Sequence, residues 1–165
     1  MTQSNITLRE YEHPRWGGVI HLANNEIEAI LAPERGGRLL HYSRLGESNL
    51  LWTAKDMDSG LGSPGGWRNW GGEKTWLWPE SEWPVRENGT RWPPPNEWEQ
   101  DAFEIFKPRV GTKKEPVSAN PGMEIVLANP KLRLGRIFHF PENGVRAVRR
   151  CWLIERFVTL LLLNM

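Results

Sequence analysis

Tryptophan and charged side chains are interleaved in residues 65–84, GGWRNWGGEKTWLWPESEWP, where five of the twenty residues are tryptophan. An indole presents a large flat apolar face and one N–H donor. Sugars have flat C–H faces rimmed by hydroxyl groups, so indoles beside arginine, asparagine, glutamate and lysine could stack on the face and hydrogen-bond to the rim. The segment therefore predicts a carbohydrate site, whose candidate binding residues are Trp67, Arg68, Asn69, Trp70, Lys74, Trp76, Trp78 and Glu80.

Other chemistries fit this segment less well. Glycoside hydrolysis needs two carboxyl groups that flank the scissile bond from two sides. Glu80 and Glu82 are two positions apart, so on a strand both side chains would point the same way. This spacing therefore argues against a glycoside hydrolase.

The four histidines show no metal-ligand spacing, and His21 and His41 fit hydrogen-bonded strand positions. We therefore expect no metal and no cofactor, and these patterns assign no catalytic residue.

Composition limits the partners. Lys and Arg number 21 against 20 Asp and Glu, so the chain lacks the basic excess that nucleic-acid binding requires. Cys151 is the single cysteine, which excludes an internal disulfide. The N-terminus has no apolar core of the signal-peptide type, and the longest apolar run is far shorter than a membrane span. We expect a soluble, cytoplasmic protein that binds neither nucleic acid nor membrane.

The elements that must position the tryptophan segment are short strands. Alternating apolar and polar residues, separated by turn residues such as Asn24-Asn25, indicate an antiparallel meander. No long run with helical periodicity occurs. The sequence therefore predicts an all-β fold, an antiparallel sandwich in a single domain over residues 1–165, with Trp52 and Trp152 packed in its core. The expected strands lie near residues 6–11, 19–22, 27–31, 38–42, 50–52, 102–106, 123–127, 132–140 and 145–154.

Two regions depart from this alternation. Residues 53–100 are rich in glycine, proline and tryptophan, and because disordered segments are poor in aromatic residues we expect an ordered loop. Residues 157–163, FVTLLLL, have no polar alternation and predict a strand buried on both faces. Two interpretations stay open. It is a central strand of a sandwich that continues beyond an incomplete chain, or it docks into the chain's own core or a partner subunit, which would allow self-association.

Three consecutive stretches resemble a known family: APERGGRLLHY at 32–42, SNLLW at 48–52, and the tryptophan segment itself. Together they are similar to the N-terminal half of an uncharacterised family allied to the galactose mutarotases, or aldose 1-epimerases. The resemblance is closest over residues 16–84. It implies about half of a galactose-mutarotase-like supersandwich, with a pocket for an aldose or hexose near Arg38, Arg68, Asn69, Lys74 and Trp76.

Mutarotases open and reclose the sugar ring with a histidine acid and a glutamate base. No histidine here matches that position, and the half that would supply the glutamate lies outside this chain. The resemblance therefore implies carbohydrate binding or processing without the full catalytic machinery, and any activity would be that of an aldose 1-epimerase-like isomerase. The alternative is a non-enzymatic protein-interaction module, because exposed tryptophan and proline serve protein interfaces equally well.

Overall fold

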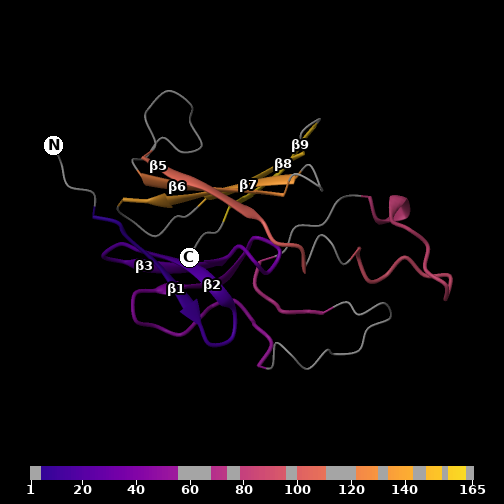
Figure 1. The fold of residues 1–165 in the computed structure, drawn as a ribbon, viewed down its shortest axis with the longest axis horizontal. Helices are drawn as coiled ribbons and strands as arrows, with labels where there is room; N and C mark the ends of the chain where they lie inside the picture. The colour runs from indigo at the N-terminus through magenta and orange to yellow at the C-terminus, as the bar shows by residue number, and fades with distance from the viewer. Residues whose placement is uncertain are drawn as a thin grey trace.

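The computed structural model describes residues 5–55, 68–73, 79–95, 100–110, 122–129, 134–142, 148–153 and 156–162 (Figure 1). These residues form two antiparallel sheets. The first sheet has the order β1 (Thr7–His13), β2 (Gly17–Ala23), β3 (Ile27–Ala32) and β4 (Arg38–Arg44). The second has the order β5 (Glu104–Val110), β6 (Gly122–Asn129), β7 (Leu134–Pro141), β8 (Val148–Leu153) and β9 (Arg156–Leu162).

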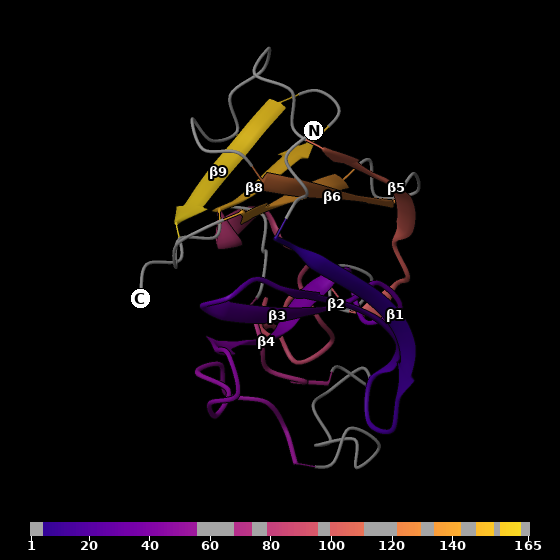
Figure 2. The same cartoon turned by 90° about the vertical axis from the view of Figure 1, so that its left-hand side faces the viewer.

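The two sheets are stacked in layers, and the main core lies between them (Figure 2). Alternation along the strands explains this, because every second side chain of a strand points to the same face. In β3, Ile27, Ala29 and Leu31 point inward, and in β6, Ile125 and Leu127 do so with no exposed surface. The prediction of an all-β antiparallel sandwich is confirmed.

Buried polar groups tie the two sheets together. The Asn24 side chain donates from Nδ2 to the Pro141 carbonyl at 3.0 Å. Arg136 on β7 is 1% exposed, and its Nη1 donates to the Gly37 carbonyl at 2.9 Å. The same guanidinium lies 4.7 Å from the ring centroid of Phe103, a cation–π distance. The turn after β3 and the chain leading into β5 are therefore fixed against the second sheet.

The outer face of the first sheet is also covered, which the alternation of β3 does not predict. A second apolar cluster buries Ile30 and Ala32 of β3 there. Its cover comes from outside the sheet, because Ala54 and Trp70 pack onto these strand residues. The paired segments 52–54 and 70–72 thus form a third, short layer on this face.

The expected strand at residues 50–52 does not form, and that prediction is wrong. The outer edge of β4 is already occupied: the Asn49 side chain accepts from the Tyr42 amide at 3.0 Å and donates to the Leu40 carbonyl at 2.8 Å. The Leu50 amide donates to the Tyr42 carbonyl, and the Glu73 amide to the Leu39 carbonyl. The following residues pair elsewhere, through an isolated bridge between Thr53 and Gly71.

The C-terminal strand expected at residues 157–163 corresponds to β9. It pairs antiparallel with β8 and is the last strand in the sheet order of the described residues. Both interpretations of this strand stay predictions. Self-association through β9 stays a prediction.

Candidate functional site

Two of the predicted site residues, Arg38 and Trp70, are buried in the outer-face cluster. Arg38 is 1% exposed, and its Nη1 donates to the Gly71 carbonyl at 2.9 Å. Trp70 is 4% exposed, with the guanidinium carbons of Arg35 and Arg38 at 5.1 and 5.7 Å from its ring centroid. These stacked cations and the indole fix residues 70–71 onto the sheet, so neither Arg38 nor Trp70 offers a broad surface to a ligand.

The other predicted residues are placed differently. Arg68 and Asn69 are half-buried and directly precede the segment paired with Thr53. The Asn69 side chain accepts from the Gly71 amide at 3.2 Å, which forms a local turn. Glu80 is exposed and begins the 3₁₀ helix η2 (Glu80–Glu82). Trp67, Lys74, Trp76 and Trp78 lie outside the described residues.

Trp52 lies beside Gly71 and Gly72, although its position in the sequence predicts plain core packing. It is 62% exposed, so that prediction is wrong. The Gly72 amide donates to its carbonyl at 2.7 Å, and the Ala54 amide donates to the Trp70 carbonyl at 3.1 Å. These bonds place Trp52 opposite Gly72, and the Asn69 side chain bonds to the adjacent Gly71. We call Trp52, Arg68 and Asn69 the Trp52 surface.

Gly71 explains how the indole of Trp52 is held. Its φ is +79°, a conformation that residues with side chains rarely adopt. A Cβ atom at Gly71 would lie 2.3 Å from the Trp52 carbonyl oxygen and 2.7 Å from its ring atom Cε3. Because Gly71 has no side chain, Trp52 of the same chain can pack directly against its backbone. The indole rests with part of its ring on the Gly71 backbone.

A second exposed indole belongs to the described loop 79–95, which extends to one side of the two sheets (Figure 1). Trp92 is 46% exposed, and its ring centroid lies 6.4 Å from that of the buried Trp83. Arg86 holds the loop from within, since its Nη2 donates to the Pro93 carbonyl at 2.8 Å and to the Pro94 carbonyl at 3.1 Å. Residues 79–95 are thus held by hydrogen bonds within the loop, and the ordered loop expected over residues 53–100 stays a prediction.

A polar cluster of His21, Glu28, His41 and Ser43 lies on neighbouring strands of the first sheet. The Nε2 atom of His21 is 3.0 Å from Oε2 of Glu28, and Nε2 of His41 is 2.8 Å from Oγ of Ser43. Both histidines are hydrogen-bonded strand residues, as expected. Ser43 and His41 resemble a nucleophile and base, but Glu28 faces Nε2 of His41 at 3.8 Å. A catalytic triad needs the carboxylate at the other ring nitrogen, so the cluster is not one.

The environment of this cluster lowers two pKa values. Burial lowers the pKa of His41, and the positive charges of His21 and His13 act in the same direction against the opposing charge of Glu28. Burial alone would raise the pKa of Glu28, but the hydrogen bond from the Gly46 amide and the contacts with His21 and His41 outweigh it and lower that pKa. The cluster therefore favours a neutral His41 beside an ionised Glu28.

We expect the free energy of unfolding to fall as the pH drops below 6.5. His41 takes up its proton near 6.5 in the unfolded chain but only at a lower pH in the folded chain, so protonation favours unfolding in that window. In His41→Gln, the slope of stability against pH between about pH 6.5 and 5 should be shallower. Urea unfolding at a series of pH values measures it. Identical slopes in the two proteins would contradict the expectation.

Two kinds of feature are absent from the described residues. In that part of the chain, no group of three or more histidine, cysteine, aspartate or glutamate side chains is arranged to hold a metal ion. Nor do the described ranges contain a helix with the length and apolar character needed to cross a membrane.

The chain was also compared with known proteins. Models of protein families, curated proteins and solved structures gave no match in any of the three comparisons.

Proposed function

We propose that this chain binds carbohydrate through the Trp52 surface. The observation that carries the proposal is the 62% exposed indole of Trp52, which rests on Gly71. The amide of Gly71 donates to the side chain of the predicted residue Asn69, which Arg68 precedes in the chain. A rigid indole loses little conformational freedom when a sugar stacks on it. Because its backbone is paired with residues 70–72, the ring is presented from ordered structure.

Arg68 and Asn69 would supply hydrogen-bonding groups for the hydroxyl rim of the sugar. A guanidinium carries five N–H donors and an asparagine amide carries two, so each can bond to sugar hydroxyls in addition to a protein partner. Arg68 and Asn69 are half-buried, which limits the ordering cost of such bonds. The ligand class that fits is an aldose or hexose. No catalytic residue is assigned, and binding is proposed without turnover.

The test is a titration with glucose, galactose and mannose, followed by the indole N–H resonances of ¹⁵N-labelled protein. We expect a hexose to shift the Trp52 resonance, and Trp52→Ala to weaken binding by about tenfold, equivalent to about 1.4 kcal/mol. Trp92→Ala is the matched control, because Trp92 is also exposed but belongs to the separate loop 79–95.

Two results would count against a sugar site there. One is the absence of any shift in the Trp52 resonance at about 50 mM of each hexose, a concentration that would reveal even millimolar affinity. The other is equal weakening by Trp52→Ala and Trp92→Ala.

A protein-interaction module remains the second candidate, and a different observation favours it. Leu45, Leu50 and Trp52 are 50%, 62% and 62% exposed in the chain that follows β4. Exposed apolar side chains of this kind are common at protein interfaces. Sedimentation velocity distinguishes the two candidates. An oligomer that dissociates in Leu50→Ala, together with a Trp52 resonance unmoved by sugars, would favour the interface.

A further inference from the structure

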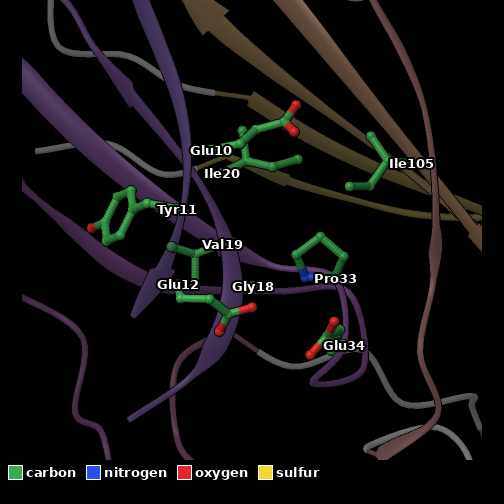
Figure 3. A pocket seen from close by; sticks show the side chains of 9 residues that line it. All are labelled: Glu10, Tyr11, Glu12, Gly18, Val19, Ile20, Pro33, Glu34 and Ile105. Atoms are coloured by element: carbon green, nitrogen blue, oxygen red, sulfur yellow. The ribbon is translucent and has the colours of Figure 1, made fainter. Parts of the chain in front are cut away.

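A pocket of about 310 Å³ lies at the open edge of the sandwich (Figure 3). Its walls come from β1 and β5, which are edge strands of the two sheets, and from residues of β2. Pro33 and Glu34, in the turn between β3 and β4, line it as well. None of the Trp52 surface residues lines it. The pocket is therefore a separate feature of the molecule.

The pocket has an apolar floor. Ile20 is 1% exposed, and Pro33 is buried. Ile105 of β5 adds an apolar wall and remains 46% exposed. Burying the exposed part of Ile105 under a ligand would be favourable by about 25 cal/mol per Å². The hollow can therefore take an apolar group, and its volume is at the lower end of the range for small-molecule sites.

Carboxylates surround this floor. Glu10, Glu12 and Glu34 all line the pocket (Figure 3). A Cβ atom built on Gly18 would be 3.4 Å from Oε1 of Glu34 and 3.6 Å from Oε1 of Glu12, so two carboxylates converge over a residue that has no side chain. Among the described residues, no lysine, arginine or histidine forms an ion pair with any of these three carboxylates.

We propose that this pocket binds a small organic cation, an ammonium or guanidinium group on an apolar stem. The stem would lie against Ile20, Pro33 and Ile105, and the charged end would lie between Glu12 and Glu34. A bare metal ion is a poorer fit, because in the described ranges no group of three or more histidine, cysteine, aspartate or glutamate side chains could hold one.

The probe is 2-phenylethylammonium, with 2-phenylethanol as its neutral counterpart of the same shape. We expect the ammonium ion to bind about tenfold more tightly than the alcohol in calorimetric titrations at low salt. Because the carboxylates are exposed, added salt should weaken the binding of the ion and leave that of the alcohol unchanged.

Variants locate the site. Glu12→Gln and Glu34→Gln should each weaken binding of the ammonium ion about two- to fivefold, the range for an exposed charge pair. Glu47→Gln is the matched control, since Glu47 is an exposed glutamate that does not line the pocket. Circular dichroism checks that each variant is folded. Equal affinity for the ion and the alcohol would overturn the proposal, as would equal weakening by Glu47→Gln or no binding of the ion at about 5 mM.

Discussion

Replacing Gly37 with alanine is expected to lower the free energy of unfolding by about 2–4 kcal/mol. Gly37 has φ +58°, and a Cβ atom there would lie 2.6 Å from Cγ of Phe103. Phe103 cannot move aside easily, because it is 4% exposed and the guanidinium of Arg136 lies over its ring. The substitution therefore adds steric overlap between the sheets to the backbone cost of a positive φ.

Gly46→Ala separates these two contributions. Gly46 has a similar φ of +76°, but no atom lies within 4 Å of a Cβ atom at that position. The free energy of unfolding of Gly46→Ala should fall by about 1 kcal/mol, from the cost of the backbone conformation alone. Urea unfolding of both variants measures the difference. If the two variants lose equal stability, the contact with Phe103 is not what makes glycine necessary at position 37.

Replacing Asn24 with alanine is also expected to lower the free energy of unfolding, by about 2–4 kcal/mol. Asn24 is 4% exposed, and its Oδ1 accepts from the amides of Glu26 and Ile27, each at 2.8 Å. Its Nδ2 donates across the sandwich to the Pro141 carbonyl. Alanine removes all three bonds, and the buried Ile27 amide and Pro141 carbonyl then lose these partners in a site with little access to water.

Asn49→Ala is the matched control. Asn49 makes the same kinds of bond, from the amides of Tyr42 and Leu51 and to the Leu40 carbonyl, but it is half-buried and bonds within one sheet and its adjoining loop. Water can replace some of the hydrogen bonds that Asn49→Ala removes, so we expect the free energy of unfolding to fall by only about 1–2 kcal/mol. Chemical unfolding followed by circular dichroism gives both values. A loss from Asn49→Ala that matches or exceeds that from Asn24→Ala would contradict the role of Asn24 between the sheets.

Local patterns were enough to predict most strands. The alternation at Ile27, Ala29 and Leu31 reappears as the inner face of β3, and the expected turn at Asn24-Asn25 forms. The strand expected at 50–52 failed because side-chain bonds from Asn49 take the positions on β4 that a new strand would use. Periodicity describes the faces of a strand but contains no information about which groups compete for its edge.

The candidate site was harder to predict, since it depends on contacts between distant residues. The density of tryptophan indicates a site, but whether an indole faces inward depends on pairing between residues 52–54 and 70–72. That pairing buries Trp70 and exposes Trp52, the reverse of what their sequence positions predict. The acidic pocket has no sequence signal at all, because Glu10, Glu12 and Glu34 meet only when the sheet edges are assembled.

The side-chain and loop bonds along β4 also affect how this protein meets other molecules. An open strand edge can recruit a strand from another polypeptide and so lead to aggregation. On β4, Asn49, Leu50 and Glu73 occupy groups that such a strand would need. At the opposite margin of the same sheet, β1 carries Arg9, Glu10 and Glu12, charges that oppose the addition of an incoming strand. The first sheet is thus protected at both margins from growth by polymerisation, by competing bonds on one side and by charge on the other.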